Sequence, residues 1–326
     1  MRASIRHLMA AALAALSLVA APGAFAQGAY PNKPIRLVIP IGAGGVGDNM
    51  MRVISERMLP TLGQPLLLGN RPGAGGNVRM DLVAQAPPDG YTLVMNGPAM
   101  AINASLYKKL SFDPAKDLIP ITPIALAQFA VFVSGKLPVK NIGEFIAYAK
   151  SSREKLNFAS VGAGTAGHLS AVLFTLAAGI EMTHVPYKSI QAAVPDLVTG
   201  SVHLVFNAYP PLAPLLADGK LKVMGFTSLK RQRGYPDVPT LSETGLPGFE
   251  AGGWYMVAAP AGTPHDVLQR LNTEMVRAVN SPEASDALIK MGLEPLALSL
   301  NDSARFFARE IDTWGRAVKV SGASAD

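Results

Sequence analysis

Short runs of aliphatic residues alternate along the chain with longer segments in which apolar residues recur every three or four positions. The run Ile35–Ile39 predicts a strand, and Met50, Ile54 and Met58 predict one face of the helix that follows, over 48–62. Further strands are expected at 66–68, 91–95, Leu156–Ser160, 202–206 and Leu221–Phe226, and further helices around 82–84 and at 140–150, 168–178, 192–198, 263–279, from 281 and at 302–319. This alternation indicates an α/β protein with parallel, doubly wound sheets.

Two more apolar runs indicate how the chain passes between two halves of the molecule. Residues 127–134 predict a long strand that leads from a first lobe into a second, and 254–258 predict a strand that returns. Thr263 followed by Pro264 predicts the start of the next helix, with Thr263 as the N-cap. The length of the chain allows two domains of ordinary size.

Two glycine-rich loops join a predicted strand to a predicted helix. Each has the spacing G-x-G-x-x-G, at 42–47 and at 162–167. Glycines let the backbone turn sharply, and a helix start presents unpaired N–H groups at the positive end of its dipole, so either loop suits an anion. The same spacing occurs in dinucleotide sites, but no acid follows 66–68; Arg71 stands there instead. A carboxylate site is the preferred interpretation, and tight turns without a ligand are the alternative.

Polar residues at the helix starts and strand ends are candidate ligand contacts. Thr165 is expected to donate to an anion or to cap its helix, and His168 to face the ligand or to pack as a neutral core residue. Tyr187 and Lys188 follow a strand, where open α/β sheets bind ligands, although Lys188 also fits a solvated surface position. Asn96 and Asn207 end predicted strands and either reach the site or order their own turns.

The first 26 residues have the pattern of an export signal. Arg2 and Arg6 precede an alanine-rich apolar run, and Ala24-Phe25-Ala26 predicts cleavage after Ala26 and release into the periplasm. Removal of the signal leaves 300 residues and lowers the net charge from +6 to about +4. This mild positive charge fits an acidic ligand, and without a dense basic run no nucleic-acid partner is expected.

Catalytic and cofactor chemistry have little support in the sequence. The chain has no cysteine, which excludes thiolate chemistry, and its five histidines lack metal-ligand spacing. Ser160 and Ser189 lack the pattern of a nucleophile elbow, and no pair of carboxylates is placed for acid–base work. We therefore expect a protein that is not an enzyme and uses neither cofactor nor metal.

Motifs along the whole mature chain resemble the Bug-type periplasmic solute receptors of tripartite tricarboxylate transporters. They include Gly44-Gly45 with Asp48, the stretch 70–77, P-D-G-Y-T-L at 88–93, Gly164-Thr165 with His168, H-V-P-Y-K at 184–188, P-D-V-P-T at 236–240 and A-P-A-G-T-P at 259–264. The resemblance implies a two-lobe periplasmic binding protein, type II-like, with a doubly wound sheet in each lobe and a ligand cleft between them. The first lobe is expected at 27–126 and 255–326 and the second at 127–254.

The resemblance also implies a set of ligand contacts, in which the two glycine loops hold one carboxylate. The expected site residues are Ile41, Gly44, Gly45, Gly47, Asp48, Asn96, Gly162, Gly164, Thr165, His168, Tyr187, Lys188 and Asn207. Ile41 replaces a usual aromatic residue and Gly47 a frequent hydroxyl residue. Asn207 stands where aspartate is common, which favours a plain carboxylate over an amino acid.

The resulting hypothesis is a monomeric receptor that captures a small organic acid and delivers it to the membrane subunits of a transporter. An exported α/β enzyme acting on a carboxylated substrate is the first alternative. A ligand sensor of the same fold is the second. Turnover of a bound acid would separate the receptor from the enzyme, and a neighbouring permease would separate it from the sensor.

Overall fold

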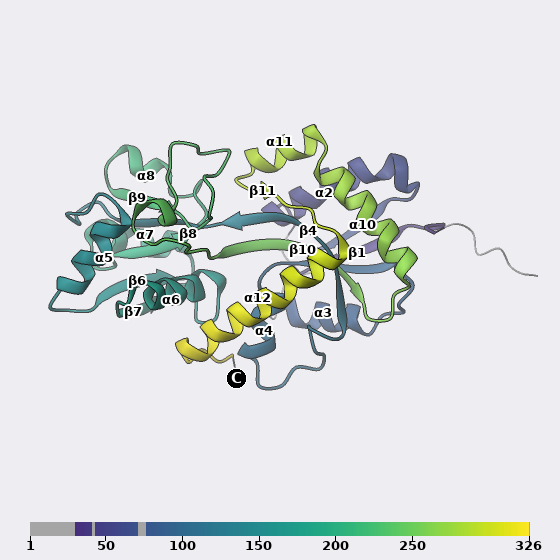
Figure 1. Ribbon diagram of the computed structural model, residues 1–326, viewed down its shortest axis with the longest axis horizontal. Helices are drawn as coiled ribbons and strands as arrows, with labels where there is room; N and C mark the ends of the chain where they lie inside the picture. The colour runs from purple at the N-terminus through teal and green to yellow at the C-terminus, as the bar shows by residue number, and fades with distance from the viewer. Residues whose placement is uncertain (1–29, 41–42, 71–75, 326) are drawn as a thin grey trace, which may run out of the picture.

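The strands of the protein form two sheets, which lie in separate halves of the molecule (Figure 1). The computed structural model describes residues 30–40, 43–70 and 76–325. The predicted export signal, Ile41, Gly42 and Arg71 lie outside these ranges. The first sheet has the order β11-β4-β10-β3-β1-β2, and its strands are β1 (Ile35–Ile39), β2 (Leu66–Asn70), β3 (Thr92–Asn96), β4 (Leu118–Gln128), β10 (Gly252–Pro260) and β11 (Glu294–Pro295).

The second sheet has the order β7-β6-β8-β5-β9. Its strands are β5 (Ala130–Ser134), β6 (Leu156–Ser160), β7 (Met182–Pro186), β8 (Leu204–Asn207) and β9 (Leu221–Phe226). In each sheet three neighbouring strands are parallel: β2, β1 and β3 in the first, and β7, β6 and β8 in the second. Parallel strands place their carboxyl ends at one edge, which is where open α/β sheets bind ligands.

Helices cover both faces of each sheet. On the first sheet, α2 (Val46–Leu62), α10 (His265–Val279) and α11 (Pro282–Lys290) pack on one face, while α3 (Asn77–Ala84), α4 (Ala99–Leu106) and α12 (Leu300–Ser321) pack on the other. The second sheet is covered by α5 (Ile142–Ser151), α6 (Ala166–Ala178) and α9 (Leu241–Thr244) on one face and by α7 (Ile190–Thr199) and α8 (Pro214–Ala217) on the other. The two-lobe α/β fold expected from the sequence is confirmed.

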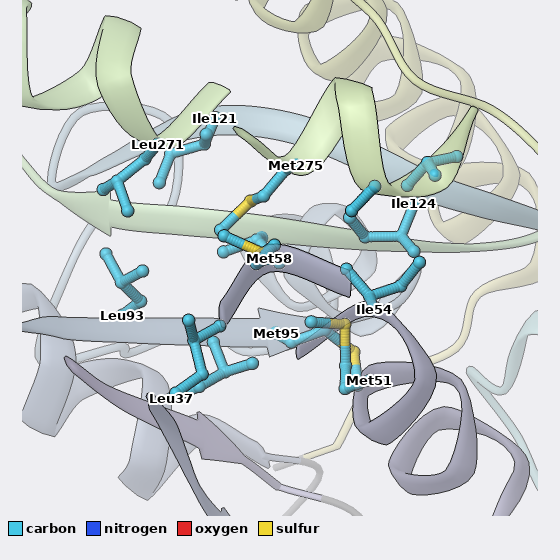
Figure 2. Close-up of a cluster of buried hydrophobic side chains, with 14 of the residues drawn as sticks. Leu37, Met51, Ile54, Met58, Leu93, Met95, Ile121, Ile124, Leu271 and Met275 are labelled. Atoms are coloured by element: carbon cyan, nitrogen blue, oxygen red, sulfur yellow. The ribbon is translucent and has the colours of Figure 1, made fainter. Parts of the chain in front are cut away.

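Alternation along β1 explains how one strand serves two cores. Ile35, Leu37 and Ile39 point into the core beneath α2 and α10, and Val38 belongs to the core on the opposite face. Figure 2 shows the first of these cores, in which Met51 and Met58 of α2 pack between strands and α10. The first glycine-rich loop and the two elements it joins, β1 and α2, form what we call the first glycine corner, and both of these elements are anchored in the core.

Two strands lead the chain from the first sheet to the second and back. β4 ends at Gln128 and β5 begins at Ala130, and β10 begins at Gly252 after the chain leaves the second sheet (Figure 1). Phe129, between β4 and β5, is held by Thr227, whose hydroxyl accepts from its N–H at 3.1 Å. We call residues 127–129 and 250–253 the hinge. The predicted lobe boundaries fall inside β4 and β10, which pair from Gly252 with Gln128 to Pro260 with Leu118.

The two lobes also touch at two places beside the hinge. Leu169 of α6 is fully buried in the core formed by α3, α4 and α12 of the first lobe. On another side, Arg233 of the second lobe forms an ion pair with Glu294 of β11, with an Nε–Oε1 distance of 2.5 Å. These contacts set the relative position of the lobes in the structure.

Among the differences from the sequence-based expectations, three concern β4, α4 and the start of α10. The run 127–134 is not one strand, because the chain breaks at Phe129 and the first sheet reaches back to Leu118. Helix α4 was not expected at all. Thr263 does not cap α10: its hydroxyl donates to the Pro260 carbonyl at 2.8 Å, and Pro264 occupies the cap position.

Candidate functional site

The first glycine corner joins β1 to α2 and contains a buried carboxylate. Gly44 adopts φ +77°, a left-handed conformation that favours glycine, and its N–H donates to Asp48 Oδ2 at 2.9 Å. Arg52 Nε donates to the same oxygen at 3.1 Å. Burial raises the pKa of the Asp48 carboxyl, but hydrogen bonds from Gly44, Arg52 and Asn70 outweigh it and hold the pKa below its usual value. Asp48 is thus ionised at neutral pH.

The first amides of α2 have no hydrogen-bond acceptor among the described residues. Gly45 is the N-cap, with φ −72° and ψ 167°, and it offers no side chain to the helix. The first intrahelical bond runs from Asn49 N–H to the Gly45 carbonyl, and among the described residues the N–H groups of Gly45, Val46 and Gly47 donate to no protein group. They lie at the positive end of the α2 dipole.

The second corner joins β6 to α6 and is capped by neutral side chains. Thr165 Oγ1 accepts from His168 N–H at 3.4 Å and donates to the Gly162 carbonyl at 2.8 Å. Gly164, at φ +75°, donates its N–H to His168 Nδ1 at 3.1 Å. Thr165 therefore serves as a helix cap, and the amides of Ala166 and Gly167 at the start of α6 donate to no group among the described residues.

His168 is a neutral residue in this arrangement. Its Nδ1 accepts a hydrogen bond, so the proton of the neutral ring is on Nε2. The side chain is buried, and its ring stacks on Phe158 and lies 4.1 Å from the His184 ring, centroid to centroid. Burial, aided by the neighbouring His184, lowers the pKa of His168 to about 4.

Sequence reasoning missed the partner of this histidine, which is His184 on β7. Ser160 Oγ lies 2.7 Å from His184 Nε2 and also accepts from Gly162 N–H at 3.1 Å. Burial lowers the pKa of His184 as well. The Ser160 side chain is 2% exposed, so the serine hydroxyl sets the shape of the glycine loop and does not face solvent. Ser160 and His184 come close to each other because the strands that carry them, β6 and β7, pair in parallel.

The remaining predicted residues lie at the same strand edges but differ in what their side chains do. Asn96, at the end of β3, is 7% exposed and donates to Met80 Sδ at 3.4 Å. Tyr187 donates its hydroxyl to Asp196 Oδ2 at 2.6 Å, and burial raises its pKa to about 12. Lys188 is exposed, and half-buried Asn207 donates to the Ala208 carbonyl at 3.3 Å. Asn96 and Tyr187 are thus engaged within the protein, whereas Lys188 extends into solvent.

Helix α4 brings the second corner against the first lobe. A Cβ atom at Gly164 would lie 2.6 Å from Leu106 Cδ1, so the loop and α4 are in close contact. Asn103 of α4 donates to Asn77 Oδ1, at the start of α3, at 2.6 Å. The pair Asn77 and Asn103 adds polar groups that were not among the predicted contacts. The second corner therefore lies at the junction of the lobes, beside the helices that follow β2 and β3.

Two further properties of the described ranges bear on function. No group of three or more His, Cys, Asp or Glu residues in them is arranged to hold a metal ion. None of the helices within these ranges is long and apolar enough to cross a membrane.

Comparison with known proteins gives consistent matches over most of the chain. Residues 50–323 match the family described as "Tripartite tricarboxylate transporter family receptor". Protein BugT of Bordetella pertussis is 31% identical over 296 residues, which cover 90% of this chain and 91% of BugT. The solved structure of Rpa4515 of R. palustris with adipate is 34% identical, with a TM-score of 0.73, over 90% of this chain and 99% of that one. MatC from Rhodopseudomonas palustris with bound malate is 31% identical, with a TM-score of 0.69, over 89% and 100%.

Proposed function

Because the chain belongs to the receptor family of the tripartite tricarboxylate transporters, we propose that it is a periplasmic protein that captures a small carboxylated solute between its lobes and delivers it to a membrane permease. The observation that supports this most directly is the pair of helix starts, α2 and α6, whose first amides donate to no group among the described residues. A carboxylate that accepts such N–H groups is held without a dedicated cation.

The chemistry of the ligand is proposed from the same groups and from the relatives. Two relatives of the same fold carry adipate and malate, which are both dicarboxylates. In this chain one carboxylate would meet the α6 amides of Ala166 and Gly167, and exposed Lys188 is placed to attract the other end of the acid. Asn207 offers no charge to a ligand ammonium, which favours a plain acid.

A thermal-shift screen of the chain beginning at Gln27, over mono-, di- and tricarboxylates at neutral pH, tests the ligand class. An acid that binds only the folded protein adds about 2.7 kcal/mol at a hundred times its dissociation constant. We expect the melting temperature to rise by several degrees with at least one acid. The absence of any shift over the panel would contradict the carboxylate assignment.

Recovery of the bound acid separates the receptor from the enzyme alternative. We expect the acid to be released unchanged after prolonged incubation, as measured by NMR of the released solute. A new product would favour an enzyme. Delivery is tested by uptake of the labelled acid in cells with and without the receptor. We expect uptake to be lost in cells without the receptor. Unchanged uptake would favour the sensor.

Export is tested by the N-terminus of the protein recovered from periplasm. Mass spectrometry should give a chain that begins at Gln27, because the small residues of Ala24-Phe25-Ala26 precede it. An intact Met1 would contradict export by cleavage. Light scattering on the same sample tests the predicted monomer.

A further inference from the structure

A separate cavity of about 490 Å³ lies at the hinge, within the size range of small-molecule sites. Residues of both connecting strands line it, with α12 of the first lobe on one side and Leu173 of α6 on the other. Leu173 is eight residues beyond Thr165, about 12 Å along the helix, so this cavity is distinct from the second glycine corner. An occupant would touch both lobes.

The floor of the hinge cavity is built from two indoles and a carboxylate. Trp254 of β10 and Trp314 of α12 are at most 2% exposed, and both donate their indole N–H to Glu310 Oε2, at 2.5 and 2.8 Å. Leucines 126, 173, 296 and 298 and Phe306 supply an apolar wall. The cavity therefore offers a large apolar surface next to a carboxyl group that two indole N–H groups hold in place.

Two charged side chains at the hinge cavity, Glu250 and Arg309, form no hydrogen bond within the described residues. The guanidinium of Arg309 attracts the Glu250 carboxylate, but the two groups lie too far apart for an ion pair within 4.0 Å. Gln128 is 6% exposed; its Oε1 accepts from Thr227, and its Nε2 donates to no group in the described ranges. Glu250 and Arg309 are exposed to solvent, so both remain able to pair with an occupant of the cavity.

The charge balance of the lining points to a positive ligand. Two carboxylates, Glu250 and Glu310, face one guanidinium, that of Arg309. Burial raises the pKa of both carboxyl groups, and the Arg309 guanidinium opposes this rise without reversing it. A cation placed between them would supply the missing charge.

We propose that the hinge cavity is a second binding site, which takes an organic cation with an apolar body, of the class of the arylalkyl amines. The ammonium group pairs with Glu250 and Glu310, and the body packs on the leucines and Phe306. Because the site includes residues of both lobes, its occupant couples to the relative position of the lobes.

Intrinsic fluorescence tests this proposal directly, because the chain has two tryptophans and both line the cavity. Titration of the full mature chain with 2-phenylethylamine should give a saturable change in tryptophan emission. The neutral 2-phenylethanol, which keeps the apolar body, should bind at least fivefold more weakly, and methylammonium, which lacks the body, should give no saturable change.

Substitution of Glu250 then identifies the site. Glu250→Gln should weaken 2-phenylethylamine binding at least fivefold, whereas Glu283→Gln, an exposed glutamate on α11, should leave it unchanged. Both variants change surface carboxylates, and a thermal melt confirms that they fold. The proposal is overturned if the wild type shows no saturable change, if 2-phenylethanol binds as tightly as the amine, or if Glu250→Gln binds as tightly as the wild type.

Discussion

The two glycine corners share a sequence pattern, yet their electrostatics differ. At the first, ionised Asp48 lies in the opening turn of α2 and accepts from Gly44 and Arg52. At the second, Thr165 and neutral His168 cap α6, and no acidic residue lies in its first turn. Asp48 already compensates the positive end of the α2 dipole, whereas no acidic side chain in the first turn of α6 compensates the α6 dipole.

The difference teaches that a matching glycine spacing does not imply matching affinity for an anion. A carboxylate near α2 is repelled by Asp48 at short range, and one near α6 meets amides alone. We infer that the second corner provides the stronger carboxylate contact and that the first orients the solute.

The largest effect is expected from adding one methyl group to each corner. Gly44 and Gly164 have nearly equal φ angles, +77° and +75°, so alanine at either position should cost about 1–2 kcal/mol of backbone strain. At Gly164 the new Cβ also meets Leu106 at 2.6 Å, whereas Gly44 has open space. Gly164→Ala should therefore weaken acid binding more than tenfold, and Gly44→Ala less than threefold, by calorimetric titration. Equal losses would refute the ranking of the corners.

Removing the charge of Asp48 should have the next largest effect. Asp48→Asn keeps an acceptor for Gly44 but removes the repulsion, so acid binding should tighten about threefold at low salt and less at high salt. Stability should fall by about 1 kcal/mol in urea unfolding, because a charge at a helix start is lost. The control is Asp302→Asn, in the first turn of distant α12, which should leave binding unchanged. Affinity that is unchanged in Asp48→Asn at both salt concentrations would mean that α2 does not contact the acid.

Acid should destabilise the protein through the second corner. The folded-state pKa of His168, about 4, lies below its ordinary value of 6.5, so the unfolded chain binds more protons between these pH values. The stability contributed by neutral His168 is complete above pH 6.5 and is lost as the pH falls toward 4. Melting temperatures measured from pH 7 to 4.5 should fall by several degrees, and His168→Gln should show a shallower fall. An identical slope in the variant would mean that the pKa of His168 is the same in the folded and the unfolded chain.

The smallest effect is expected at Lys188. Its side chain is exposed, so its attraction to the acid is screened by solvent and salt. Lys188→Ala should weaken binding by only about twofold, and Lys290→Ala, an exposed lysine on α11, should have no effect. Complete loss of binding in folded Lys188→Ala, by the same calorimetric titration, would show that an ion pair and not the helix amides holds the ligand.

The sequence predicted the parts of the fold in which periodicity and burial agree. β6 and β9 have the expected bounds, since their aliphatic runs end at clear turns. β4 was missed because Pro120 and Pro123 argue against a strand; both are tolerated because β11 pairs only with Leu126 and Ala125, which leaves the proline stretch of β4 at an edge. α4 was missed because it is buried along most of its surface and shows no polar face.

The contacts of the candidate site could be predicted where they lie within one loop. They could not be predicted where they depend on which strands or helices lie side by side. The glycines, Asp48 and Thr165 act within a few residues of each other, so their positions follow from the loop pattern. The Ser160–His184 contact depends on which strand lies beside β6, and the Asn77–Asn103 contact depends on how two helices meet. Neither pairing is encoded in the spacing of one segment.

The position of β10 in the first sheet has a consequence for the order in which the lobes assemble. β10 separates β3 from β4, whereas every strand of the second sheet comes from the single stretch 130–226. When the chain emerges with its N-terminus first, all strands of the second sheet are present before β10, which is the neighbour of β4. The first lobe, although it begins the sequence, finishes last, and until Gly252–Pro260 arrives β4 lacks the neighbour that joins it to the rest of its sheet.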